Sequence, residues 1–158
     1  MKIYRLKQTQ FLPLKLSEAW EFFSTPKNLA KITPEQMDFQ ILYISGGEKA
    51  YAGQIIQYRV NVLPGIRVNW VTEITQLKEP HHFIDEQRFG PYTLWHHQHH
   101  FKEVSGGVEM TDEVNYAIPL GLLGRLAHWI FVGREVNRIF EHRFQVLEKY
   151  FAKSKAQS

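Results

Sequence analysis

The strongest constraint on this chain is a long middle segment in which apolar and polar residues alternate with a period of two. The alternation covers Phe39 to Ala117, and short segments that contain glycine or proline divide it. Successive side chains of a strand point to opposite faces of a sheet, and such short turns join neighbouring antiparallel strands. The pattern therefore predicts a six-stranded meander with strands at Phe39–Ile44, Gln54–Val62, Arg67–Leu77, His81–Phe89, Tyr92–Val104 and Val108–Ala117.

The segments on either side of the meander complete the element order. Ile3–Phe11 alternates in the same way and predicts an edge strand. Ser17 is expected to cap a short helix, and a second short helix is expected at Pro26–Ile32. From Leu122 to about Phe151 the spacing becomes helical, which predicts one helix about 45 Å long. Its apolar stripe consists of Leu122, Leu126, Ile130, Phe140, Phe144, Leu147 and Phe151.

Length and composition indicate one globular domain. The chain has 158 residues, 44% of them hydrophobic, and we expect a single domain over residues 1–152 with a solvated tail at 153–158. A net charge of +3 falls short of the basic face of a nucleic-acid-binding protein, so no nucleic-acid partner is expected. The absence of cysteine excludes disulfides and thiolate sites, and it agrees with a cytoplasmic location.

No segment of the sequence is expected to cross a membrane or to direct export. The most apolar stretch, Leu120–Gly133, contains Arg125 and His128 and is shorter than the ~20 residues that a bilayer requires. Lysine and arginine residues interrupt the N-terminal region, which therefore lacks the apolar stretch of a signal peptide.

The element order predicts an α+β architecture with an internal cavity. Seven antiparallel strands with one apolar face need a cover, and only the C-terminal helix is long enough to provide it. A strongly twisted sheet would wrap around that helix, and the two short helices would close one end. We expect a cavity between the sheet and the helix.

Several runs of residues resemble the START-like superfamily of helix-grip proteins, abbreviated SRPBCC, which includes polyketide cyclases. The local match is to an uncharacterised bacterial ligand-binding subfamily of SRPBCC proteins. The resemblance covers nearly the whole chain and implies a helix-grip fold: a seven-stranded curved antiparallel sheet wrapped around a long C-terminal helix, with two short helices after the first strand. The runs that carry it are Phe83–Gln87, Gly90–Tyr92, Trp95–Phe101, Thr111–Tyr116 and Pro119–Gly121.

One acidic residue lies in the apolar row of the last strand of the meander. A buried carboxylate such as Asp112 is costly unless it is paired, and the preceding strand offers His99 as a partner. A turn at Gly106-Gly107 places Phe101 opposite Asp112, whereas a turn at Ser105-Gly106 places His99 there. Either register keeps the His99 and Asp112 side chains within about 8 Å of each other. The inward row of the preceding strand is Trp95, His97, His99 and Phe101.

Three interpretations of the His99–Asp112 pair remain open at this stage. The two side chains could satisfy each other and fix the strand register, anchor a polar group of a ligand, or act in general acid–base catalysis. His97 and His99 share a strand face, but no third or fourth zinc ligand is evident, so no metal site is expected. The sequence also contains no phosphate-binding glycine loop, and no cofactor is expected.

Further candidates come from the remaining inward-facing positions. If Phe83 and Phe89 mark the buried face of their strand, Asp85 and Gln87 point inward; the alternative is the opposite face of that strand. Trp70 and Trp95 are interpreted as core residues or as walls of the cavity. Gly133 suggests a close approach by a ligand or by the sheet, and Asn137 follows one turn later.

The expected function is the binding of a small hydrophobic or amphipathic molecule in the cavity. The resemblance implies two alternatives, a cyclase or dehydratase-like enzyme that uses a His–Asp acid–base pair, and a partner-binding module similar to coenzyme Q-binding proteins. The candidate ligand-binding residues are Trp70, Asp85, Gln87, Trp95, His97, His99, Asp112, Tyr116 and Asn137.

Overall fold

The fold is that of a single curved antiparallel sheet, seen in a computed structural model that describes residues 1–63 and 65–155. Within these residues the sheet has seven strands in the order β1-β7-β6-β5-β4-β3-β2, so the six strands of the meander are neighbours in sequence order. Every predicted strand is confirmed, with ends that differ by at most two residues. The strands are β1 (Tyr4–Leu12), β2 (Gln40–Ile44), β3 (Ile55–Leu63), β4 (Ile66–Lys78), β5 (His82–Phe89), β6 (Leu94–Val104) and β7 (Gly107–Ala117).

Short helices connect β1 to β2. These are α1 (Leu16–Phe23), the 3₁₀ helix η1 (Pro26–Ile32) and a single 3₁₀ turn, η2 (Glu35–Met37). The helix predicted at residues 26–32 is confirmed, but the prediction that Ser17 caps α1 is wrong. The N-cap is Lys15 and the helix begins two residues earlier than predicted, because the carboxylate of Glu18 accepts the backbone N–H of Lys15 at 2.8 Å.

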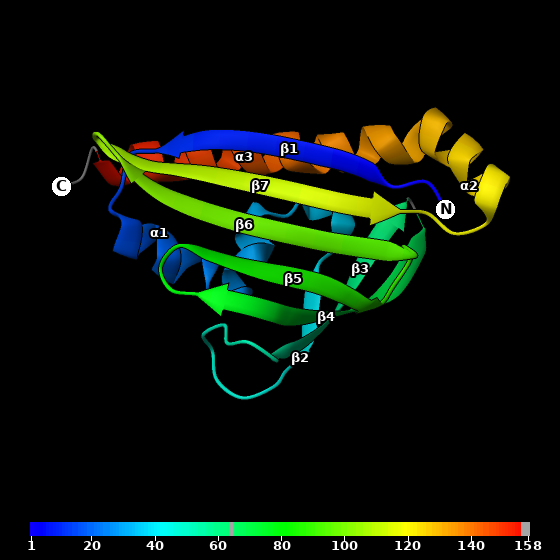
Figure 1. Ribbon diagram of the computed structural model, residues 1–158, viewed down its shortest axis with the longest axis horizontal. Coiled ribbons are helices and arrows are strands. Elements are labelled where there is room, and N and C mark those ends of the chain that lie inside the picture. Colours follow the sequence, from blue (N-terminus) through cyan, green and yellow to red (C-terminus); the bar gives the residue numbers. More distant parts are fainter. Residues whose placement is uncertain (64, 156–158) are drawn as a thin grey trace.

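The C-terminal helical region begins right after β7 and contains an irregular turn. It consists of α2 (Gly121–Ala127), the π-helical turn η3 (His128–Val132) and α3 (Gly133–Lys155). Figure 1 shows α2 bending away from the axis of α3, as expected for a helix interrupted by a π turn. Residues 153–155 of the predicted tail continue α3, and residues 156–158 lie outside the described residues. No helix in the described part of the chain is both long and apolar enough to cross a membrane.

The bend at η3 changes which part of the predicted apolar stripe is buried. Phe140, Leu147 and Phe151 are buried against the sheet, as predicted. Leu122 and Leu126 were predicted to belong to the same stripe, but their exposed fractions are 77% and 52%. The prediction is wrong for this end of the helix, because the π turn directs α2 away from the sheet.

The curved sheet and α3 enclose the core. Figure 1 shows α3 running along the sheet beside β1 and β7, with α1 at the opposite end from α2. One group of buried apolar side chains lies beneath α1 and the end of α3, and it includes Trp20, Phe101 and Leu147. A second group lies beneath the start of α3 and includes Val114 and Phe140.

The β6–β7 hairpin adopts the second of the two registers left open by the sequence. Ser105 and Gly106 form the turn, and Gly106 has a positive φ of +82°, which favours glycine. His99 therefore lies directly opposite Asp112. His97, His99 and Phe101 are buried and Trp95 is half-buried, so the predicted inward row is confirmed.

Candidate functional site

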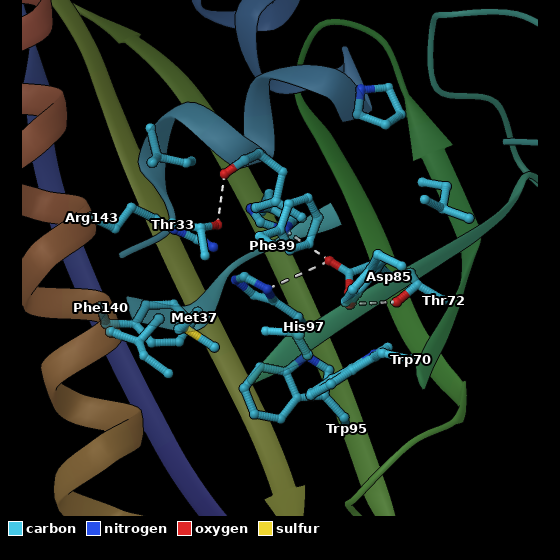
Figure 2. Close-up of a pocket in the computed structure, with 18 of the residues that line it drawn as sticks. Thr33, Met37, Phe39, Trp70, Thr72, Asp85, Trp95, His97, Phe140 and Arg143 are labelled. Atoms are coloured by element: carbon cyan, nitrogen blue, oxygen red, sulfur yellow. Dashed lines mark hydrogen bonds and ion pairs between the residues drawn. The ribbon is translucent and has the colours of Figure 1, made fainter. Parts of the chain in front are cut away.

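A cavity of about 340 Å³ lies between the sheet and the helical elements. Strands β3 to β6, helix η1 and α3 contribute to its wall, which is mainly apolar and aromatic. Figure 2 shows Trp70, Trp95 and Phe140 around one part of this space. Its size and lining are typical of a small-molecule site, for which about 300–1,000 Å³ is usual. The charged or titratable groups in the wall include Asp85, His97, His99, Glu135 and Arg143.

Five of the nine candidate residues lie in the wall of this cavity: Trp70, Asp85, Trp95, His97 and His99. Asp112 is buried and is not part of the cavity wall; the imidazoles of His97 and His99, which are part of the wall, both contact its carboxylate. Asp112 is therefore joined to the cavity wall only through its contacts with these two histidines.

Gln87 and Phe89 differ from the prediction. The Gln87 amide donates to the Tyr92 carbonyl at 2.6 Å and accepts the Tyr92 backbone N–H at 3.2 Å, so it holds the β5–β6 turn. Phe89 is 73% exposed, whereas it was expected to mark the buried face. The cause is a shift in the β4–β5 register between Gln87 and Phe89, which breaks the alternation at the end of β5.

Tyr116 and Asn137 also lie outside the cavity wall. The Tyr116 hydroxyl is 2.9 Å from His128 Nε2, next to the π turn. Asn137 was expected to face the cavity but is exposed, and its amide donates to the Gly133 carbonyl at 2.8 Å. The glycine at 133 is explained by its own helix, since a Cβ there would lie 2.9 Å from His128 Cε1.

Arg143 on α3 lies in the cavity wall as well, although it is not among the residues predicted from sequence. A signal for it was present in the helical spacing. Arg143 follows Phe140 by three residues and precedes Leu147 by four, so it shares their face of the helix. Because arginine is charged, it is ordinarily expected at a solvent-exposed position.

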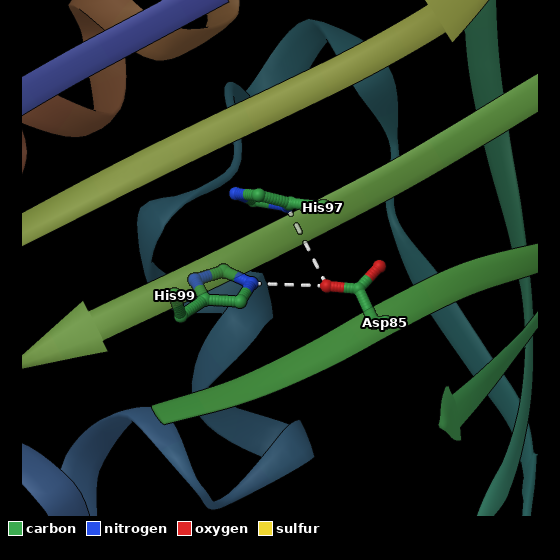
Figure 3. Close-up of side chains that lie close together, drawn as sticks. All are labelled: Asp85, His97 and His99. Carbon is green, nitrogen blue, oxygen red and sulfur yellow. Dashed lines mark hydrogen bonds and ion pairs between the residues drawn. The ribbon is translucent and has the colours of Figure 1, made fainter. Parts of the chain in front are cut away.

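The strand registers bring two carboxylates and two imidazoles together on the inner face of the sheet. Asp85 lies opposite His97 across the β5–β6 pair, and His99 lies opposite Asp112 across the β6–β7 pair. Figure 3 shows Asp85 of β5 directed at both histidines of β6. We call Asp85, His97, His99 and Asp112 the His–Asp cluster.

Four contacts close the His–Asp cluster into a ring. His99 Nε2 lies 2.9 Å from Asp85 Oδ2, and His97 Nε2 lies 3.0 Å from Asp112 Oδ1. His99 Nδ1 lies 2.8 Å from Asp112 Oδ1 without hydrogen-bond geometry, so this contact is ionic. The fourth contact, from His97 Nδ1 to Asp85 Oδ2, is longer, at 3.5 Å.

These distances fit one charged and one neutral imidazole. A nitrogen held next to a carboxylate oxygen is stabilised only if it carries a proton, and both nitrogens of His99 lie within 3 Å of such an oxygen. We therefore assign His99 as an imidazolium. His97 needs a proton only on Nε2, and its long Nδ1 contact fits a nitrogen without one.

The electrostatics of the cluster agree with this assignment. Burial disfavours the charge on His99, but the carboxylates of Asp112 and Asp85 outweigh burial and raise its pKa. Burial and the neighbouring charge of His99 lower the pKa of His97. Burial alone would raise the pKa of both acids, but the two histidines lower the pKa of Asp112 and of Asp85. Two carboxylates and one imidazolium give the cluster a net charge of −1.

Part of the cluster has the composition of a metal site. Asp85, His97 and His99 each offer a ligand atom, and these atoms lie within 4.8 Å of one another. A metal ion would have to replace the protons of His99, because a ligating imidazole nitrogen must be deprotonated. The contacts described above pair these groups without a metal, and the expectation of no metal site stays a prediction.

Comparisons with known proteins give the fold. No protein-family model matches the sequence, and no curated protein is similar to it. Among solved structures, a protein of Thermus thermophilus is 13% identical with a TM-score of 0.69, over 96% of this chain and 99% of that one. The major latex-like protein 151 of Panax ginseng is 12% identical with a TM-score of 0.65, over 94% and 97% of the two chains.

A third solved structure is a two-domain protein. The di-domain ARO/CYC BexL from the BE-7585A biosynthetic pathway is 12% identical with a TM-score of 0.72, and the match covers 94% of this chain and 50% of BexL. This chain thus spans about half the length of BexL. The likeness confirms the helix-grip fold that the sequence resemblance implied.

Replacing Asp112 with asparagine is expected to lower the free energy of unfolding by about 3 kcal/mol, because it leaves the buried His99 charge with a single carboxylate. Glu113→Gln is the matched control, since Glu113 pairs with the exposed Arg5 and its loss should cost no more than about 1 kcal/mol. Urea denaturation of both variants measures the difference. Equal losses in the two variants would contradict the role given to the His–Asp cluster.

The two cluster histidines are expected to titrate on opposite sides of the ordinary histidine pKa of about 6.5. NMR of the imidazole Cε1–H groups should show His99 titrating above this value and His97 below it, as their shifted pKa values require. The stability that His99 contributes is complete below pH ~6.5 and is lost as the pH rises through its raised pKa. Parallel titration of both rings near pH 6.5 would refute the assignment.

Proposed function

We propose that this protein binds a small hydrophobic or amphipathic molecule in the cavity between the sheet and α3. The observation that carries the proposal is the cavity itself, with an apolar wall and a few polar groups gathered on it. Tyr58, Trp70 and Trp95 form a continuous aromatic part of this wall, with neighbouring ring centroids 5.8 and 5.3 Å apart. Such a surface suits an apolar ligand body that contains a ring.

Filling the cavity is expected to block binding. Val60 is buried on β3 and lines the cavity, and Val60→Phe adds bulk inside it. The affinity for the neutral fluorophore N-phenyl-1-naphthylamine should fall at least about tenfold, which corresponds to about 1.4 kcal/mol. Each methylene-sized group of the probe that can no longer be buried weakens binding by about 0.8 kcal/mol. The measurement is a fluorescence titration.

Asn69→Phe is the matched control for this experiment. It adds an aromatic side chain to β4 at an exposed position outside the cavity wall, and it should leave the affinity unchanged. Failure of the unmodified protein to bind the probe, or equal binding by Val60→Phe, would count against the proposed function. Native mass spectrometry of protein purified from its own host would identify the molecule that occupies the cavity.

The His–Asp cluster supports a second candidate, acid–base catalysis on the bound molecule. His97, as a neutral imidazole, could accept a proton, and His99, as an imidazolium, could donate one; their ring centroids lie 3.8 Å apart in the cavity wall. The solved structures with this fold include two di-domain ARO/CYC proteins of biosynthetic pathways. Ligand binding remains the preferred function, because a fixed acid–base pair serves equally as a polar anchor.

His99→Gln separates the two candidates. In a binding protein this change should weaken affinity for the co-purifying molecule by at most about 1.5–3 kcal/mol, the contribution of a hydrogen bond from a charged donor, and should leave that molecule chemically unaltered. In an enzyme it should lower turnover by about 10²–10⁴-fold. We expect mass analysis to recover an unaltered molecule after incubation with either form. Catalysis would be established instead if the unmodified protein made a product that His99→Gln did not make. The control His100→Gln, which changes an exposed histidine, should then make the product as well.

A further inference from the structure

We propose that Arg143 is the anchor for a carboxylate group of the bound molecule, so that the ligand is an amphipathic acid rather than a neutral apolar compound. This inference rests on the proposed function and adds to it the chemical class of the ligand and the direction in which the ligand lies. The carboxylate would lie at the α3 wall, with the apolar body along the aromatic residues of the sheet.

The first observation is a buried guanidinium without a partner. Arg143 is only 8% exposed, and it lines the cavity. It forms no hydrogen bond and no ion pair with residues 1–63 or 65–155, and its Nε is fully buried without an acceptor. Figure 2 shows its side chain reaching from α3 into the space beside Thr33. Its guanidinium lies over the Phe140 ring, with Arg143 Cζ 5.0 Å from the ring centroid.

The acidic groups of the wall are all engaged elsewhere. Asp85 contacts His99 at 2.9 Å, and Glu135 contacts Arg138 at 2.7 Å. The Thr33 hydroxyl donates to the Leu29 carbonyl, so its hydrogen is in use as well. Arg143 therefore faces the cavity with its donors available, although its field reaches Asp85 and helps to lower the pKa of that carboxyl.

A buried guanidinium selects its ligand by geometry and by charge. It presents five N–H donors in a planar fork that a carboxylate can accept with both oxygens, whereas a neutral carbonyl offers a single oxygen. Leaving such donors unpaired beside an apolar ligand costs free energy, because the ligand displaces the water that would otherwise hydrate them. A molecule that fills the cavity without supplying acceptors would therefore bind more weakly than an acid of the same shape.

The charge on the opposite wall sets the orientation. The His–Asp cluster on the sheet carries a net charge of −1 by the assignment above, and it repels a second anion. Arg143 is the cation on the helix wall, since the charge of Arg138 lies at the exposed surface and is paired with Glu135. An acid entering the cavity would thus direct its carboxylate toward α3 and its apolar end toward the sheet.

The test compares acids with neutral molecules of the same shape. Calorimetric titration with 2-naphthoate and with its isostere 2-naphthamide, and with dodecanoate and dodecanamide, measures the preference for the charged group. We expect at least one acid to bind about 10- to 100-fold more tightly than its amide, the value of a charge-assisted hydrogen-bonded pair.

Variants then assign the preference to the residue. Arg143→Met keeps an unbranched side chain without the charge, and it should abolish the preference for acids while retaining N-phenyl-1-naphthylamine binding. It should also raise the thermal midpoint, because an unpaired buried charge is removed. Arg134→Met, at an exposed position on the same helix and outside the cavity wall, should change neither property.

The outcomes distinguish this inference from the proposed function. If the neutral fluorophore binds but acids and amides bind equally, or if Arg143→Met retains the preference, the anchor is disproved and the proposed function stands. If neither the fluorophore nor any acid binds, both are disproved. A lower thermal midpoint in Arg143→Met would show that Arg143 has a structural partner, which also overturns the inference. Arg143→Gln repeats the comparison if Arg143→Met does not fold.

Discussion

The pairing of two carboxylates with two buried histidines is the interaction on which the rest of this structure depends. Asp85, His97, His99 and Asp112 come from three adjacent strands, and each is paired only because both strand registers are correct. A slip of one residue would turn a carboxylate to the outer face and leave a buried histidine charge without its partner. The cluster therefore makes alternative registers costly, and the same registers place Trp95 in the cavity wall.

The parts of the fold that follow from local periodicity could be predicted from sequence. Alternation with period two defined all seven strands, and it correctly identified the inward row around His97 and His99. Two hairpin turns were compatible with the sequence near Gly106, because adjacent glycines allow either one. The choice between them depends on which register pairs the buried Asp112, and that is a property of the assembled sheet.

Predictions failed where the backbone departs from regular geometry or where several strands act together. The register shift after Gln87 exposes Phe89, and the π turn at His128–Val132 exposes Leu122. Neither irregularity leaves a periodic signal. Asp112 was expected to pair with His99, and this contact is present at 2.8 Å, but the hydrogen bond to Asp112 comes from His97, which lies diagonally across the strand pair and was not predicted as a partner. Arg143 was missed because its burial depends on the cavity beside it.

The charges around the cavity link the His–Asp cluster to the proposed anchor. The cluster contributes −1 and Arg143 contributes +1, while Glu135 and Arg138 cancel each other. A bound carboxylate would therefore leave the cavity with a net charge of −1. That charge would be divided between the two walls: the carboxylate would pair with Arg143 on α3, and the remaining −1 would stay on the cluster, where His99 contacts both Asp85 and Asp112.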